Sequence, residues 1–101
     1  MMECAMAIKP CMAELGGSNP VIVLADASID HAATGIVQAL TILNGQWCCG
    51  AGRILVHQSI ARKLLGTIMK KLKTLVMGDT FNENSEIGPI SNIQNLKAIQ
   101  V

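Results

Sequence analysis

The sequence predicts an α/β fold with a mostly parallel sheet. Residues 21–24 form a continuous apolar run between turn-forming residues, which is typical of a buried strand covered on both faces. Residues 53–57 form a second strand-like run. A helical pattern of apolar residues follows each run. Because strands that alternate with helices are joined by crossover connections, we expect the strands to be parallel.

The first 45 residues are expected to hold a lead-in, a turn, a strand and a helix. Residues 1–12 are expected to be irregular or extended, since the residue before Pro10 is biased away from helix. Residues 16–20 have the composition of a turn. Ser28 is a suitable N-cap for the helix that follows. This helix is expected to end near residues 44–45, an Asn-Gly pair that suits a left-handed C-terminal cap. Its apolar positions recur at helical spacing: Ile29, Ala32, Ala33, Ile36, Val37, Leu40 and Leu43.

The second half is expected to hold a strand and two helices. After the strand at residues 53–57, Ser59 is expected to cap a helix that ends at Gly78. Residues 80–89 are polar and are predicted to form a loop, and a short third helix is expected from residue 93. The apolar stripe of the longer helix is formed by Ile60, Leu64, Ile68, Leu72 and Leu75.

Composition narrows the classes of protein to which the chain can belong. Its 101 residues suit one small domain, and half of them are hydrophobic but only 2% are aromatic, so an aliphatic core is predicted. The net charge is +1 with no basic patch, which argues against a nucleic-acid partner. Residues 32–52 are uncharged but interrupted by polar residues and glycines, so no membrane span is predicted. Four cysteines without a secretion signal predict free thiols and a cytoplasmic location.

Cys48 and Cys49 lie between the predicted helix and strand, in a segment rich in glycine. Glycine lets the backbone approach a ligand closely, and a thiol in its thiolate form is a nucleophile. The alternative is a small buried hydrophobic role, which is common for a free cysteine. Two adjacent cysteines can also form a strained vicinal disulfide on oxidation. The paired Cys-x-x-Cys spacing of a zinc site is absent, so no metal site is predicted.

Two motifs carry a resemblance to a known family. Residues 44–48, Asn-Gly-Gln-Trp-Cys, resemble the cysteine motif of the NAD(P)-dependent aldehyde dehydrogenases, and residues 13–20 resemble the glutamate motif of that family. The motifs occur in the order and at the separation that the family uses. Residues 77–80 and 87–90 resemble its Gly-Asp-Pro and Gly-Pro-Leu segments. The chain departs from the pattern where Ser18 and Thr80 replace the family's lysine and proline.

The resemblance implies a fold and a set of site residues. Residues 1–101 would be part of a three-layer catalytic domain, with the cofactor-binding and oligomerisation segments mostly outside them. The family places the tail of a helix and then a strand in the N-terminal region, and residues 9–15 would be that strand. Cys48, the second residue after the glutamine, would be the nucleophile that forms a thiohemiacetal and then a thioester. Glu14 would be the base that activates water to hydrolyse the thioester. Leu15 and Gly16 would lie near the nicotinamide ring.

The same resemblance implies partners and leaves alternatives. The substrate would be an aldehyde, the cofactor NAD or NADP, and the intact enzyme a homo-oligomer. Trp47 would line the aldehyde tunnel or pack in the interior. Arg53 would raise the positive potential near the thiol or pin the loop to a carboxylate, with the structural role favoured. The chain has no glycine-rich dinucleotide fingerprint of its own. The alternative function is an inactive truncated remnant that self-associates through exposed apolar faces.

Overall fold

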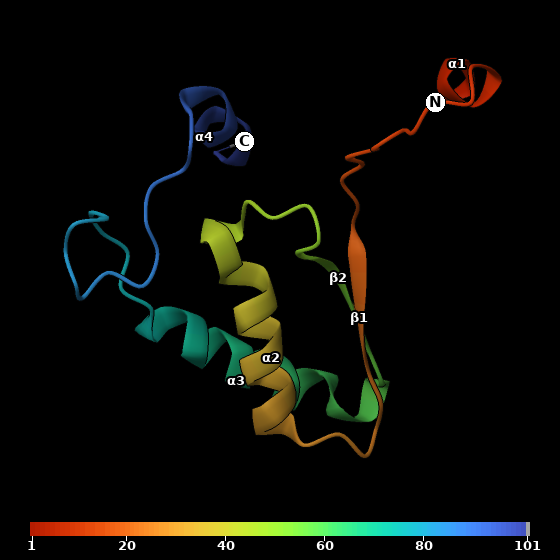
Figure 1. Cartoon of the computed structure of the whole chain (residues 1–101). Coiled ribbons are helices and arrows are strands. Elements are labelled where there is room, and N and C mark those ends of the chain that lie inside the picture. The colour runs from red at the N-terminus through yellow and green to blue at the C-terminus, as the bar shows by residue number, and fades with distance from the viewer. Residues whose placement is uncertain (101) are drawn as a thin grey trace.

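The computed structural model describes residues 1–100 and shows two strands with helices around them (Figure 1). The elements in chain order are α1 (Met2–Met6), β1 (Asn19–Val23), α2 (Ile29–Thr41), the 3-10 turn η1 (Ile42–Gly45), β2 (Ala51–Val56), α3 (Gln58–Thr74) and α4 (Ile93–Ile99). The two strands are hydrogen-bonded to each other in parallel. The predicted α/β fold with a parallel sheet is confirmed.

The core lies where α2 and α3 pack against each other and against the sheet. Its buried members are Val23, Ala33, Ile36, Val37, Leu64 and Ile68. Ile36 from α2 and Leu64 from α3 are each only 1% exposed. Burying one such side chain contributes about 1.5–3 kcal/mol. These contacts therefore hold α2, α3 and the sheet together as one unit.

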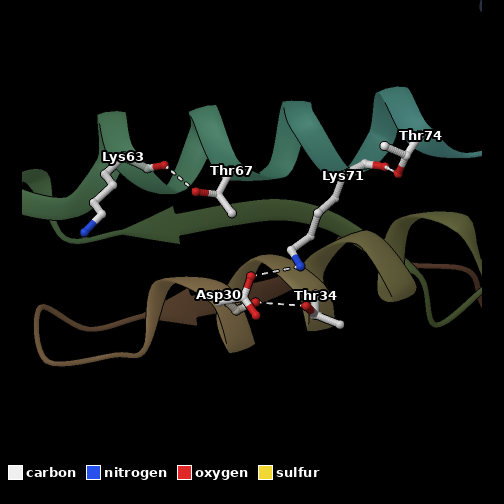
Figure 2. Close-up of polar contacts among 6 residues, drawn as sticks. All are labelled: Asp30, Thr34, Lys63, Thr67, Lys71 and Thr74. Carbon is white, nitrogen blue, oxygen red and sulfur yellow. Dashed lines mark hydrogen bonds and ion pairs between the residues drawn. The ribbon is translucent and has the colours of Figure 1, made fainter.

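A single ion pair joins the two helices at their surface (Figure 2). Lys71 Nζ of α3 lies 2.9 Å from Asp30 Oδ1 in the first turn of α2. The hydrogen bond and the positive charge of Lys71 hold the pKa of Asp30 below its ordinary value. Figure 2 also shows Thr34 Oγ1 donating to the Asp30 carbonyl oxygen at 2.9 Å, within its own helix.

The other face of the sheet is not covered by the described residues. Val23 of β1 and its partner Val56 of β2 face the core, whereas Ile22 and its partner Leu55 are 67% and 52% exposed. Successive side chains of a strand point to opposite faces, so these exposed side chains lie together on the far side of the sheet. The expectation that residues 21–24 are covered on both faces is wrong here, because α2 and α3 cover one face. Of the three layers expected, the described residues form the sheet and one layer of helices.

The N-terminal segment differs from its prediction. Met2–Met6 is a helix rather than an irregular or extended lead-in, because its residues are mostly good helix formers. The chain then leaves helix geometry at Ile8, where φ is 52°. Residues 9–18 contain no strand, so the strand implied at residues 9–15 is absent. These residues are exposed and have no neighbouring strand to pair with among the residues described.

α2 begins where predicted but ends at Thr41, before the predicted end near residues 44–45. Ser28 is the N-cap residue, although its side chain makes no capping hydrogen bond. At the other end α2 passes into η1, and the chain turns left-handed at Leu43 with φ 50°, Asn44 with φ 58° and Gly45 with φ 72°. The left-handed cap predicted near residues 44–45 is confirmed and begins one residue earlier.

Helix α3 begins and ends earlier in the chain than predicted. The N-cap is His57 rather than Ser59, because His57 Nδ1 accepts a hydrogen bond from the backbone N–H of Ser59 at 3.3 Å. The helix ends at Thr74 rather than Gly78, since Leu75 adopts an extended backbone. The predicted loop at residues 80–89 and the helix Ile93–Ile99 are both found. No helix among residues 1–100 is long and apolar enough to cross a membrane.

Candidate active site

The two sequence motifs meet at one edge of the sheet. Residues 13–20 run into β1, and residues 44–48 lie just before β2. Because β1 and β2 are parallel, the segments that precede them arrive at the same edge, and Asn19 pairs with Ala51 there. Figure 1 shows the orange strand β1 beside the green strand β2, with both amino ends at the same end of the sheet.

Asn19 fastens the cysteine loop to the strand β1. Its Nδ2 donates to the carbonyl oxygen of Cys48 at 3.2 Å and to the carbonyl oxygen of Gly50 at 3.3 Å. One amide group thereby binds the backbone on both sides of Cys49. Carbonyl groups on a tight exposed loop otherwise depend on water for their hydrogen bonds, so this contact orders the loop.

A second contact joins the start of β2 to Ser18 of the glutamate motif. Arg53 Nε donates to the carbonyl oxygen of Ser18 at 3.1 Å. A Cβ atom on Gly52 would lie 2.7 Å from Ser18 Cα, so glycine is required at this close approach. Arg53 therefore has a structural role, as favoured by the sequence, but its partner is a backbone carbonyl rather than the expected carboxylate.

The thiols of Cys48 and Cys49 lie side by side on the surface. Residues 47–50 form a turn in which the Gly50 N–H donates to the Trp47 carbonyl oxygen at 3.0 Å. Both cysteines are exposed, and their Sγ atoms are 3.8 Å apart. The alternative of a buried hydrophobic role for Cys48 is therefore wrong within this structure. Trp47 is also exposed, which rules out interior packing among the described residues.

The surroundings of Cys49 oppose ionisation of its thiol. The hydrogen bond to Cys48 raises the pKa of the Cys49 thiol, and the negative charges of Cys48 and Glu14 raise it further. An anion next to a thiol opposes formation of a second anion. The charge of Glu14 is the smallest of these influences on the pKa, after the desolvation of Cys49, and it bears on Cys49.

Residues 14–16 are exposed and lie outside any helix or strand. Glu14 makes no hydrogen bond or ion pair with another of residues 1–100. Leu15 projects into solvent, and no atom lies within 4 Å of the position that a Cβ on Gly16 would occupy. The structure therefore places these three residues on an open surface, and no hydrogen bond or ion pair among residues 1–100 joins their side chains to the cysteine loop.

Two polar residues of the cysteine motif hold a distant segment. Asn44 Oδ1 accepts from the Gly88 N–H at 2.9 Å, and Asn44 Nδ2 donates to the Pro89 carbonyl oxygen at 3.5 Å. Gln46 Oε1 accepts from the Ser91 N–H at 2.9 Å. The segment at residues 88–91 is thus tied to the cysteine loop, which gives both side chains a positioning role that a turn alone would not require.

Asn19 is the residue that sequence reasoning missed. The sequence places it in a turn composition before a strand, with nothing to mark its side chain. The predicted parallel pairing contained the signal, because a residue at the start of β1 must lie beside the residues that enter β2. Among residues 1–100 no group of three or more His, Cys, Asp or Glu side chains is placed to hold a metal ion.

Comparison with known proteins places this arrangement in a family. The model of the aldehyde dehydrogenase family matches residues 1–101. A probable succinate-semialdehyde dehydrogenase of Sinorhizobium fredii, whose name specifies NADP(+), is 39% identical over 101 residues, covering 100% of this chain and 21% of that protein. The structure of an aldehyde dehydrogenase from Brucella melitensis biovar abortus 2308 superposes with a TM-score of 0.89 at 31% identity, covering 98% of this chain and 20% of that one.

A further solved structure extends the comparison to a bound cofactor. Glyceraldehyde-3-phosphate dehydrogenase from Methanocaldococcus jannaschii, in complex with NADP, superposes with a TM-score of 0.83 at 36% identity, covering 86% of this chain and 19% of that one. The chain spans about a fifth of the length of the curated relatives that it matches. The matches in sequence and in fold lead to one conclusion: this chain belongs to the aldehyde dehydrogenase family.

Proposed function

We propose that residues 1–101 are the part of an NAD(P)+-dependent aldehyde dehydrogenase that carries its nucleophile, Cys48, and its base, Glu14. The parent enzyme would convert an aldehyde, NAD(P)+ and water to a carboxylic acid and NAD(P)H, and would act as a homo-oligomer. The observation that supports this most is the meeting of the two motifs at one end of the sheet, where Asn19 donates a hydrogen bond to the Cys48 carbonyl oxygen.

Cys48 is the residue that would attack the substrate. Its exposed Sγ would add to the aldehyde carbon to give a thiohemiacetal, and the Cys48 N–H is a candidate donor to the oxygen that becomes negatively charged. Oxidation of this adduct leaves a thioester on Cys48. The hydrogen bond from Asn19 to the Cys48 carbonyl would keep the peptide units of the loop in a fixed orientation during these steps.

Glu14 would then remove a proton from the water that attacks the thioester. A base for this step needs a carboxylate that is free to accept a proton and close to the sulfur. Glu14 is exposed and unpaired within residues 1–100, and its charge acts on the neighbouring thiol. The flexible Gly16-Gly17 pair after it would let the carboxylate change position between the two stages.

The nicotinamide end of a cofactor fits the surface beside Glu14. Leu15 offers an exposed apolar side chain, and the open space above Gly16 lets a planar ring approach the backbone. Bound NAD(P)+ supplies the hydride acceptor for the oxidation. The sequence has no glycine-rich fingerprint for the phosphates, so other segments of the parent enzyme would hold the rest of the cofactor.

An activated ester tests the nucleophile and the base without any cofactor. We expect 4-nitrophenyl acetate to add one acetyl group to the 101-residue chain, and peptide mass spectrometry to locate it on Cys48. The Glu14→Gln variant should acetylate as readily but lose the acetyl group more slowly, by about tenfold or more. The matched control is Glu3→Gln, which removes a carboxylate far in sequence from Cys48 and Cys49 and should change neither rate at Cys48.

Two outcomes would contradict the proposal. Acetylation of Cys4 and Cys11 at the same rate as Cys48 would leave Cys48 without special reactivity. Equal loss of the acetyl group from the Glu14→Gln variant and the unsubstituted chain would remove Glu14 as the base. The 101-residue chain by itself is expected to give no aldehyde-dependent NADH, because hydride transfer needs a positioned acceptor, and a measurable rate would overturn that expectation.

The uncovered sheet face favours self-association as a second candidate function. Ile22, Leu24 and Leu55 are large, apolar and exposed. Apolar patches of this kind mark surfaces that bind other proteins or aggregate. We expect light scattering to detect oligomers of the chain and to detect fewer after Ile22→Thr with Leu55→Thr. A monomer at all concentrations would exclude this candidate and leave the reactive site as the preserved feature.

A further inference from the structure

We propose that Cys48 and Cys49 form a dithiol pair that hydrogen peroxide closes, reversibly, into a vicinal disulfide. The inference concerns modification of the thiols and not turnover of an aldehyde. Formation of the disulfide does not depend on the proposed function. Only the conclusion that the disulfide form is inactive rests on the proposed role of Cys48 as nucleophile.

The geometry of the turn favours closure over oxidation of isolated thiols. The two Sγ atoms are already in contact at 3.8 Å, and both side chains are exposed, so a small oxidant can reach them. A sulfenic acid formed on one sulfur would have the second sulfur as its nearest thiol. The loop that must distort, residues 46–50, lies outside any helix or strand.

The order of events follows from the different surroundings of the two thiols. The hydrogen bond to Cys48 and the nearby negative charges raise the pKa of Cys49, so Cys49 keeps its proton to higher pH and is suited to the second step. Cys48 Sγ attacks one oxygen of the peroxide, the O–O bond breaks, and a sulfenic acid and one water form. Cys49 Sγ then attacks the sulfenic sulfur, the S–O bond breaks, and its proton leaves with the departing hydroxide as a second water. Two thiols are oxidised by two electrons in total, and one peroxide is reduced.

The closed form should be easy to reopen. Adjacent Cα atoms are about 3.8 Å apart, whereas Cα atoms joined by a disulfide are usually about 4.4–6.8 Å apart. A vicinal disulfide is therefore strained, and strained, exposed disulfides are the labile ones. Because Asn19 holds the carbonyl groups of Cys48 and Gly50, closure must also displace or bend two hydrogen bonds. Both effects favour return to the dithiol when a reductant is present.

The test isolates the pair by removing the other two cysteines. In the Cys4→Ser, Cys11→Ser chain, equimolar hydrogen peroxide should give a monomer that has lost two hydrogen atoms in mass and both alkylatable thiols. Dithiothreitol should restore both. The matched control adds Cys49→Ser, and this chain should instead gain one or more oxygen atoms, with dimedone trapping the sulfenic acid on Cys48. Circular dichroism before and after treatment checks that each chain is folded.

A different mass change would overturn the inference. If the Cys4→Ser, Cys11→Ser chain gains oxygen while Cys49 stays alkylatable, or forms only disulfide-linked dimers, the pair does not close. Differential alkylation of the unsubstituted chain gives the same information without any substitution. The assay uses no ester, aldehyde or cofactor, so its failure leaves the proposed roles of Cys48 and Glu14 to be decided by acetylation.

Discussion

Asn19 Nδ2 donates a hydrogen bond to the carbonyl oxygen of Cys48 at 3.2 Å, across 29 positions of the sequence. The first residue belongs to the segment that enters β1, and the second to the loop that enters β2. The same amide group binds the Gly50 carbonyl oxygen. A single side chain thus joins the two motifs on which the proposed chemistry depends.

Removing the Asn19 amide should loosen the cysteine loop. Asn19→Ala deletes both of its hydrogen bonds to the loop, and because they are exposed we expect a loss of about 1 kcal/mol in the free energy of unfolding. Amide hydrogen exchange should quicken across residues 48–50. Asn84→Ala is the control, since Asn84 Nδ2 bonds only to nearby Asn82 at 3.3 Å, and its effect should stay within about 0.5 kcal/mol. Equal effects of the two substitutions in urea unfolding would contradict the role of Asn19.

A methyl group at Gly52 should push the start of β2 away from Ser18 of the glutamate motif. The added Cβ would lie 2.7 Å from Ser18 Cα, so the backbone must shift, at a cost of about 1–3 kcal/mol. Gly66→Ala is the matched control in α3, where no atom lies within 4 Å of the new Cβ, and it should stabilise the chain by about 0.5–1 kcal/mol. Thermal unfolding measures both, and a Gly52→Ala chain that is as stable as the parent would show that the close approach is absent in solution.

Truncation of Leu64 should lower the free energy of unfolding, whereas truncation of the neighbouring Leu65 should hardly change it. Leu64 is 1% exposed, and Leu64→Ala should cost about 2–5 kcal/mol through lost burial and the cavity left behind. Leu65 is 60% exposed, so Leu65→Ala should change the unfolding free energy by about 0.5 kcal/mol or less. A total stability of about 5–15 kcal/mol is usual for a folded domain, so the first substitution should remove a large share of that stability. The comparison is made by circular dichroism at increasing urea, and similar midpoints for the two variants would place Leu64 outside the core.

The Asp30–Lys71 pair should make stability depend on acid pH. Lys71 lowers the pKa of Asp30 below its ordinary value of 3.8, so the unfolded chain binds more protons there than the folded chain. The stabilisation is complete well above pH 3.8, begins to decline as the pH approaches that value, and is lost as the pH falls through the lower pKa of the folded state. Lys71→Met should therefore flatten the fall in stability between about pH 5 and about pH 3.

Lys70→Met is the control for that prediction. Lys70 lies next to Lys71 and forms no ion pair within residues 1–100, so its removal should leave the acid slope unchanged. Urea unfolding at each pH gives the slope. High salt should also weaken the dependence in the unsubstituted chain, because both partners reach the solvent. A slope that Lys71→Met does not alter would mean that the pair is not formed in solution.

Local patterns in the sequence predicted most of the elements but not all of their limits. The helical spacing from Ile29 and the left-handed end at residues 44–45 depend on neighbouring residues, and both are found. Local patterns did not predict the helix at Met2–Met6, whereas the family resemblance implied the tail of a helix in this region. The His57 cap was missed because a histidine nitrogen replaces the usual hydroxyl or carboxylate acceptor.

The candidate site could be predicted only as a list of residues. The motifs are short runs of consecutive residues, and they identify Cys48, Glu14, Leu15 and Gly16. The roles of Cys48 and Glu14 are proposals that the acetylation experiment tests. The contact between Asn19 and Cys48, the exposure of both thiols and the influence of Glu14 on Cys49 required the fold.

The sequence by itself determined the alternation of strand and helix, the parallel pairing and the family, because these depend on short-range periodicity and on consecutive residues. The tertiary structure alone decided that α2 and α3 cover one face of the sheet and leave Ile22 and Leu55 exposed on the other. It also decided which side chain of the first motif holds the loop of the second. The physical reason is that such contacts depend on register and packing between segments far apart in the chain, which no local preference specifies.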